Sequence, residues 1–164
     1  MQKIINGGSV PDVQLGRLVG DEIQSVSARE LFAYGRAVIL GIPGAFTPVC
    51  TKQHVPDFVK NAEKLRASGI THLICVAPND PFVLDVFARK IDPTGKIEFL
   101  SDGNLDFVSA LNLKAQNKKL FIGWRSERYL LVIENGQIVK LRVEPNILTY
   151  SCTRAVEALD SQYV

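Results

Sequence analysis

The residue best placed to do chemistry is Cys50, in the stretch GIPGAFTPVCTKQHVPDF between Gly41 and Phe58. An apolar run ends just before this stretch and a helical pattern follows it, so Cys50 falls in the first turn of a predicted helix. The amides of a first turn favour an anion, and the thiolate is the reactive form of cysteine. These residues alone leave two interpretations open: a reactive thiol, or a buried cysteine that fills a gap beneath a strand.

The neighbours of Cys50 supply further parts of a pocket. Thr47, three residues earlier, can direct a hydroxyl into the same space while it caps the helix. Pro43 and Phe46 provide apolar walls that can exclude water. His54 follows Cys50 by four residues and therefore shares its helix face.

His54 adds two competing interpretations of the site. A Cys50–His54 dyad could serve a hydrolase, with the histidine as general base. A zinc site could combine the same pair with the other cysteines. Neither has support elsewhere in the sequence, because no acidic partner for the histidine and no paired ligand spacing stands out. His72, on a predicted strand, is interpreted as structural.

Strands and helices alternate around this stretch. The predicted strands are 37–43, 70–78, 96–102 and the two arms of a hairpin at 128–144 that turns at Asn135-Gly136. The predicted helices are 47–69 with a kink at Pro56, 79–91 opened by Asn79 or Asp80, 104–112, and 151–162 capped by Ser151. This order predicts an α/β fold, with a mixed sheet and helices on its faces, and puts Cys50 at the carboxyl edge of the sheet.

Composition narrows the classes of protein. The 164 residues fit one domain (1–164), and 46% apolar with 22% charged residues is typical of a globular chain. A net charge of +2 without basic runs argues against nucleic acid, and the apolar runs are too short to span a membrane. No signal-peptide pattern opens the sequence, so a cytoplasmic location is expected. Three cysteines are too few for a disulfide scaffold.

The stretch around Cys50 resembles the active-site segment of the peroxiredoxins, in the subfamily that includes peroxiredoxin five and the plant type-II enzymes. Their pattern is P-G-A-F-T-P-x-C-S-x-x-H-x-P. The matching positions are Pro43, Gly44, Ala45, Phe46, Thr47, Pro48, Cys50, His54 and Pro56. Thr51 stands where serine is usual, and Val49 where glycine is frequent. CVAPNDPFV (75–83) and RYLLVIENGQIVKLRVEP (128–145) are also similar to family motifs, so the resemblance spans nearly the whole chain.

This resemblance implies a thioredoxin-like fold and a thiol peroxidase that reduces hydrogen peroxide and organic hydroperoxides without metal or other cofactor. Cys50 would attack the peroxide, while Thr47 and Arg128 orient it and the Pro43–Gly44 backbone shapes the pocket. The guanidinium of Arg128 would stabilise both the thiolate and the leaving oxygen. His54 would be a supporting hydrogen-bonding residue. Arg125, three residues before Arg128, is interpreted as a surface residue.

The resemblance also implies partners: thioredoxin, or glutaredoxin with glutathione, as the reductant, and a second copy of the chain in a homodimer. The segments NLDFVSALNL (104–113) and LFIGWR (120–125, with Trp124) could supply the dimer contact, although core packing explains their apolar residues nearly as well. A redox sensor or holdase without sustained turnover is the alternative function.

A second thiol can capture an oxidised Cys50 as a disulfide. Cys152 matches the resolving cysteine of animal-type members, and the start of the predicted last helix should favour its thiolate. Cys75 matches the cysteine that plant-type members use, but it lies inside an apolar strand and suits a packed core residue. We choose Cys152, with Cys75 as the alternative.

Overall fold

The structure is a computed structural model and describes residues 8–159 of the chain. Seven strands form its central sheet: β1 (Gln14–Val19), β2 (Glu22–Ser27), β3 (Arg36–Gly41), β4 (His72–Ala77), β5 (Glu98–Ser101), β8 (Tyr129–Glu134) and β9 (Gln137–Val143). Their order across the sheet is β2-β1-β5-β4-β3-β8-β9. The pairs β3–β4 and β4–β5 are parallel, whereas β3–β8 and β8–β9 are antiparallel, so the sheet is mixed as predicted.

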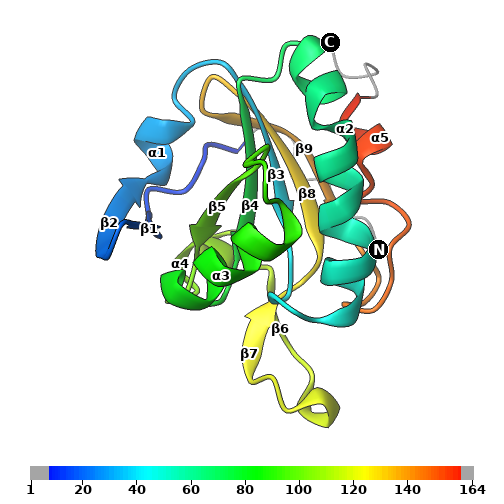
Figure 1. Cartoon of the computed structure of the whole chain (residues 1–164). Coiled ribbons are helices and arrows are strands. Elements are labelled where there is room, and N and C mark those ends of the chain that lie inside the picture. The colour runs from blue at the N-terminus through cyan, green and yellow to red at the C-terminus, as the bar shows by residue number, and fades with distance from the viewer. Residues whose placement is uncertain (1–7, 160–164) are drawn as a thin grey trace.

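Helices cover both faces of this sheet (Figure 1). The helices of the described chain are α1 (Ala28–Leu31), α2 (Val55–Ala67), α3 (Pro81–Ile91), α4 (Asp106–Ala110) and α5 (Ala155–Leu159). Side chains of α2, α3 and α5 form one hydrophobic cluster with one face of β3 and β4, and Cys50 belongs to that cluster. Side chains of α1 and α4 form a second cluster on the opposite face.

Local sequence explains most of these elements. Apart from their first residues, β3 and β4 are buried along their length, as continuous apolar runs such as AVILG predict. Helix α3 starts where the sequence indicates, because the Asp80 carboxylate accepts a hydrogen bond from the Val83 amide at 2.9 Å. Asn135 and Gly136 both adopt positive φ, at 47° and 78°, and turn β8 back into β9.

The helix expected over 47–69 is divided into two parts. A π-helix covers Cys50–His54, and α2 begins only at Val55. Pro56 is then the second residue of an α-helix, where its missing N–H costs no hydrogen bond, and it lies at the junction of the two parts rather than inside one kinked helix.

The C-terminal prediction was wrong in its starting point. Residues 151–154 are bends, and α5 begins at Ala155 instead of at a Ser151 cap. The Ser151 side chain donates its hydroxyl to the Glu144 carboxylate at 2.8 Å, so it is engaged with the end of β9 rather than with a helix. The last three residues of the predicted helix, 160–162, lie outside the described part of the chain.

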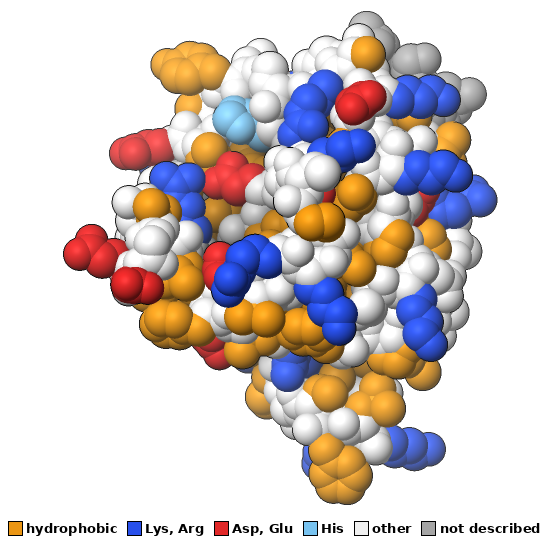
Figure 2. All heavy atoms as spheres, in the orientation of Figure 1, with side chains coloured by type: hydrophobic (Ala, Val, Ile, Leu, Met, Phe, Trp, Pro, Cys, Tyr) orange, Lys and Arg blue, Asp and Glu red, His pale blue; other side chains and the backbone are white. Residues whose placement is uncertain are grey.

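Two small hairpins were not predicted. One is β1–β2, which begins the sheet, and β2 is mostly exposed, so it lacks the apolar alternation that reveals a strand. The other joins β6 (Lys114–Gln116) to β7 (Trp124–Ser126) through a short 3-10 turn (Lys118–Leu120). This second hairpin projects from the body of the molecule, and hydrophobic side chains gather at its end (Figures 1 and 2).

Antiparallel pairing brings the site residues to one edge of the sheet. Gly41, the last residue of β3, pairs with Tyr129, the first residue of β8. The loop to Cys50 leaves β3 at this edge, and Arg128 precedes β8 at the same edge. Within residues 8–159, no helix combines the length and the apolar character needed to cross a membrane.

Candidate active site

Cys50 is fully buried at the first residue of the π-helix. The backbone is already helical at Pro48 and Val49, and the Thr51 amide donates to the Thr47 carbonyl at 3.0 Å. Cys50 therefore lies in the first helical turn, as the sequence predicts. The π-helix continues through the hydrogen bond from the Val55 amide to the Cys50 carbonyl.

Arg128 is the residue that contacts the sulfur. Its guanidinium is almost wholly buried, with 1% of the residue exposed, and Nη1 donates to Cys50 Sγ at 3.3 Å. Nη2 donates to the Ile147 carbonyl at 2.7 Å, which fixes the plane of the guanidinium. A fixed positive charge and an N–H donor at this distance favour the thiolate form of the sulfur.

His54 is a partner of Arg128 rather than of Cys50. Its Nδ1 lies 3.1 Å from Arg128 Nη1, and because a guanidinium can only donate, Nδ1 accepts this hydrogen bond. Burial, followed by the charge of Arg128, lowers the pKa of His54 from 6.5 to about 3. A neutral histidine whose lone pair is occupied by Arg128 is a poor general base, so the geometry argues against a Cys–His hydrolase.

A cavity of about 270 Å³ opens beside these residues. Its walls are mainly apolar and include the predicted site residues Pro43, Phe46, Thr47 and Arg128. The part of the lining that the sequence did not indicate comes from two distant segments: Leu120, Ile122, Ile147 and Leu148. Cys50 itself is fully buried and is not part of the cavity wall.

The loop between β3 and Cys50 is shaped by hydrogen bonds. The Thr47 hydroxyl donates to the Gly44 carbonyl at 2.8 Å, so it is engaged within the loop rather than with the helix amides. Its oxygen keeps lone pairs that can accept from a ligand. The Ala45 amide donates to Asn79 Oδ1 at 2.8 Å, which ties the loop to the segment after β4. Asn79 was missed as a site residue, although it lies in the CVAPNDPFV motif.

Arg125 is not the surface residue that the sequence suggested. It is half-buried, and its Nε donates to the Ile122 carbonyl at 2.8 Å. A Cβ atom added at Gly44 would lie 2.7 Å from Arg125 Nη1, so this guanidinium lies directly over the active-site loop. The physical reason is the β6–β7 hairpin, which was not predicted and which directs Arg125 toward Gly44.

The other two cysteines have different surroundings. Cys75 is fully buried in β4 and shares a hydrophobic cluster with Cys50; burial, and then the proximity of Cys50, raise its pKa. Cys152 is half-buried, with Sγ 3.5 Å from the Val143 carbonyl. Burial and the Glu144 carboxylate raise its pKa. The expected helix-dipole effect on Cys152 was wrong, because α5 starts three residues later.

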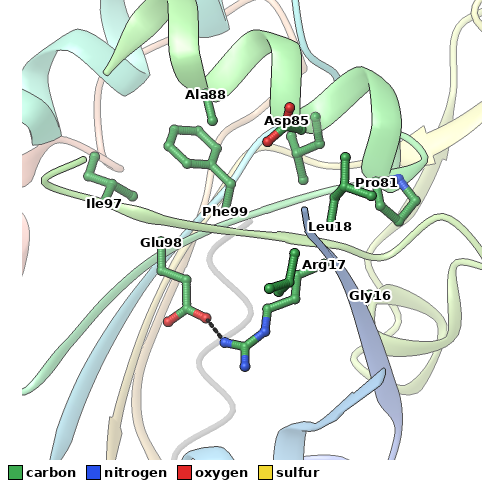
Figure 3. Close-up of a pocket in the computed structure, with 11 residues that line it drawn as sticks. Gly16, Arg17, Leu18, Pro81, Asp85, Ala88, Ile97, Glu98 and Phe99 are labelled. Atoms are coloured by element: carbon green, nitrogen blue, oxygen red, sulfur yellow. Dashed lines mark hydrogen bonds and ion pairs between the residues drawn. The ribbon is translucent and has the colours of Figure 1, made fainter. Parts of the chain in front are cut away.

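A second hollow lies away from this site. This hollow, of about 330 Å³, lies between β1, β5 and α3. Its lining includes Arg17 and Glu98, which form an ion pair at 3.1 Å (Figure 3). Neither cysteine nor histidine occurs among its described lining residues. In residues 8–159, no group of three or more histidine, cysteine, aspartate or glutamate side chains could hold a metal ion.

Comparison with known proteins identifies the family. A family model described as Redoxin matches residues 5–159. Over 145 residues the chain is 37% identical to Peroxiredoxin-2C of Oryza sativa subsp. japonica, with 88% of this chain and 90% of that protein covered. The chain belongs to the peroxiredoxins.

Solved structures of other peroxiredoxins have the same architecture. Reduced Prx3 of Vibrio vulnificus, in complex with hydrogen peroxide, is 32% identical and covers 94% of this chain and 92% of its own, with a TM-score of 0.87. Peroxiredoxin 5 of Alvinella pompejana is 28% identical, with a TM-score of 0.76 over 87% of this chain and 90% of its own. The predicted thioredoxin-like fold and the predicted subfamily are confirmed.

Peroxiredoxins are thiol peroxidases, and this peroxiredoxin is therefore an enzyme that reduces peroxides with a thiol. Family membership implies peroxides as the substrate class and thioredoxin-type proteins as the reductants. Cys50, Arg128 and Thr47 lie together at the sheet edge, as the sequence analysis expected.

Proposed function

We propose that this peroxiredoxin reduces hydrogen peroxide and alkyl hydroperoxides with Cys50 as the attacking thiolate. The sulfur attacks the terminal oxygen: a sulfur–oxygen bond forms, the oxygen–oxygen bond breaks, and water or an alcohol leaves after taking up a proton. Cys50 becomes a sulfenic acid. The observation that carries the proposal is the hydrogen bond from Arg128 Nη1 to Cys50 Sγ at 3.3 Å, made by a residue that also lines the cavity.

Arg128 and Thr47 are proposed to hold the peroxide. The guanidinium would stabilise the charge that develops on the leaving oxygen, since a buried donor needs no reorganisation. The Thr47 oxygen can accept from the peroxide O–H. The apolar side chains of Leu120, Ile122 and Leu148 suit the organic part of an alkyl hydroperoxide.

Cys152 is proposed to resolve the sulfenic acid. Its thiolate would attack the Cys50 sulfur, so that a disulfide forms, the sulfur–oxygen bond breaks, and hydroxide leaves and takes up a proton from solvent to become water. The support for Cys152 is its place among bends at 151–154, which can move without disrupting the sheet. Cys75 lies in a strand with neighbours on both sides, β3 and β5, so its displacement would disturb the core.

The reductant, assembly and location are also proposals. Thioredoxin, or glutaredoxin with glutathione, would reduce the disulfide. We propose a homodimer, because the projecting hairpin exposes Phe121 (94%) and Trp124 (54%). We further propose a cytoplasmic location, because three cysteines are too few for a disulfide scaffold and suit a reducing compartment.

The proposed chemistry can be tested by peroxide consumption in the wild type and in Cys50→Ser, Cys75→Ser and Cys152→Ser, each with thioredoxin and with glutaredoxin and glutathione. Cys50→Ser should abolish turnover, Cys152→Ser should abolish it with thioredoxin, and Cys75→Ser should retain it. A protein that consumes about one peroxide per chain and then stops would be a sensor instead. A Cys50–Cys75 disulfide found by mass spectrometry would refute Cys152.

The role of Arg128 is tested in the same assay with a matched pair of variants. Arg128→Lys keeps the charge but cannot reach Cys50, His54 and Ile147 together, so kcat/KM should fall by about 10² to 10³. Arg125→Lys, three residues away, should lower it by less than about tenfold, because Arg125 contacts the loop and not the sulfur. Equal losses in both variants would contradict the assignment.

A further inference from the structure

Two cationic side chains lie beside the active-site loop. Arg125 covers Gly44, since a Cβ atom added there would fall 2.7 Å from Arg125 Nη1 and 3.4 Å from Thr47 Cγ2. Lys90, in the last turn of α3, lies over the Phe46 ring with Nζ 5.9 Å from the ring centroid. Thr47 and Phe46 both line the cavity of about 270 Å³. The two positive charges therefore lie next to residues of the cavity wall.

The Arg125 guanidinium is fixed in place but keeps donors to spare. Its Nε donates to the Ile122 carbonyl at 2.8 Å, and Ile122 also lines the cavity. Among residues 8–159, no oxygen accepts a hydrogen bond from Nη1 or Nη2 of Arg125, and no carboxylate pairs with it. These two nitrogens form the planar end of a fork that matches the two oxygens of a carboxylate. Arg125 can therefore bind a carboxylate without first giving up another partner.

Lys90 supplies a second charge of a different kind. Its neighbour Arg89 pairs with Asp85 at 2.9 Å, whereas Lys90 forms no ion pair within the described chain. Its contact with the half-exposed Phe46 ring is a cation–π interaction, which holds the ammonium group near the cavity and leaves it in water. A lysine ammonium acts as a point charge, so Lys90 attracts an anion without setting its orientation.

The buried charge of the site has another task. Arg128 donates to Cys50, His54 and Ile147, and is therefore committed to the reacting sulfur and its surroundings. The rest of the cavity wall is mainly apolar, and no acidic side chain occurs among its described lining residues. A ligand that complements this arrangement carries a hydroperoxide group, an apolar body and a separate anionic group.

We propose that Arg125, assisted by Lys90, binds a carboxylate on the organic part of the hydroperoxide, so that the preferred substrates are hydroperoxides of organic acids. The inference rests on the proposed function, since it takes Cys50 as the attacking thiolate. The carboxylate itself does not react: the sulfur takes the terminal oxygen, and the hydroxy acid leaves after its alkoxide takes up a proton. Positive charge beside the cavity raises the rate of encounter with an anion, and the fork of Arg125 orients it.

The test compares two substrates that differ by one carboxylate: cumene hydroperoxide and its para-carboxylate derivative. The wild type is mixed with each substrate in the absence of a reductant, quenched at intervals, and analysed by mass spectrometry for loss of the free Cys50 thiol. The carboxylate derivative should react about tenfold faster at low salt. This ratio of rate constants should fall toward one as sodium chloride rises from about 0.05 M to about 0.5 M, because salt screens exposed charges.

Matched variants assign the preference to particular residues. Arg125→Gln should lower the ratio by about tenfold, because it removes both the charge and the fork. Lys90→Gln should lower the ratio by about threefold, which is the range for an exposed ion pair. Arg29→Gln, which removes an exposed charge from α1, should leave the ratio unchanged. Because each result is a ratio, a general loss of reactivity in a variant cancels.

The same measurements separate the possible failures. A wild-type ratio near one at low salt, or a ratio that Arg125→Gln leaves unchanged, would overturn the inference alone, provided that both substrates oxidise Cys50. If neither substrate oxidised Cys50 in the wild type, the proposed function would fail as well. If Arg125→Gln reacted with neither substrate, an unchanged ratio in Lys90→Gln and a wild-type ratio that does not depend on salt would overturn the inference.

Discussion

One buried guanidinium organises the side chains of the site. Arg128 donates to the sulfur of Cys50, to the ring of His54 and to the carbonyl of Ile147. A histidine in contact with a fixed positive charge, and shielded from water, has to be neutral. Protonation of His54 would therefore destabilise the folded protein as the pH falls.

The first prediction concerns this histidine. His54 has a pKa of about 3 in the folded protein and 6.5 as its ordinary value, so between these values the unfolded chain binds a proton that the folded chain does not. Its contribution to stability is complete above pH 6.5 and is lost as pH falls. Urea unfolding should show the free energy of unfolding decreasing below pH 6.5, by up to about 1.4 kcal/mol per pH unit from this group.

The comparison for this prediction is His54→Gln, which cannot titrate in this range. Measured between pH 6.5 and 4.5, the variant should show a clearly flatter dependence of unfolding free energy on pH than the wild type. The window stops at 4.5 because Glu144, whose pKa moves from 4.5 to about 2 on folding, adds its own loss of stability at lower pH. Parallel curves for the two proteins would contradict the neutral, buried state of His54.

At the scale of elements, the site depends on how closely β3 and β8 approach each other. The ring of Tyr129 lies against Gly41, where an added Cβ atom would fall 1.9 Å from Cε1. Tyr129 directly follows Arg128, and the Ser126 hydroxyl donates to the Ile42 carbonyl at 3.1 Å. The absence of a side chain at Gly41 thus lets β8, which directly follows Arg128, pair with β3, which leads to Cys50.

The second prediction is the cost of filling this space. Gly41→Ala should destabilise the protein by about 1–3 kcal/mol through overpacking, and should also lower the rate of peroxide attack because Arg128 is displaced with Tyr129. The measurement is denaturant unfolding together with pre-steady-state peroxide consumption. In a double-mutant cycle with Tyr129→Ala, the two effects should be strongly non-additive. Additive effects would mean that the Tyr129 ring is not the obstacle.

Sequence patterns predicted those elements that carry their own local signals. Asp80 caps α3, and Asn135-Gly136 turns the hairpin, because each residue acts on its immediate neighbours. The start of α5 and the place of Arg125 depend on contacts between residues that share neither a helical turn nor a strand. Glu144 binds the amides of residues 151–153, and an unpredicted hairpin carries Arg125 to Gly44. Such contacts leave no periodic pattern in the chain.

At the scale of the whole molecule, the β6–β7 hairpin exposes several apolar side chains. Phe121 is 94% exposed at its end, and Leu120, beside it, lines the cavity of the site. Exposed aromatic residues on a projecting element are typical of interfaces between proteins. A second copy packed here would cover the hairpin and also border the cavity.

The third prediction follows from this surface. Phe121→Asp should weaken the proposed homodimer, because a charge at the centre of an apolar contact must be desolvated. Sedimentation velocity over a range of concentrations should show a shift toward monomer by at least tenfold in dissociation constant. Tyr34→Asp, also at a highly exposed aromatic residue, should leave the dimer intact. Equal behaviour of the two variants would place the interface elsewhere.

Because Cys50–His54 is a π-helix, the geometry of the active site depends on the number of residues in this turn. A π-turn contains one residue more than an α-helical turn, and it survives only where the gain elsewhere compensates for its poorer geometry. Deletion of one exposed residue within it, such as Lys52, would let the chain close as an α-helix. Residues before the deletion would then rotate by about 100° about the helix axis. Cys50 would turn away from Arg128 although every residue that contacts the sulfur had been retained. We therefore expect a deletion in this turn to impair the site as loss of the arginine would.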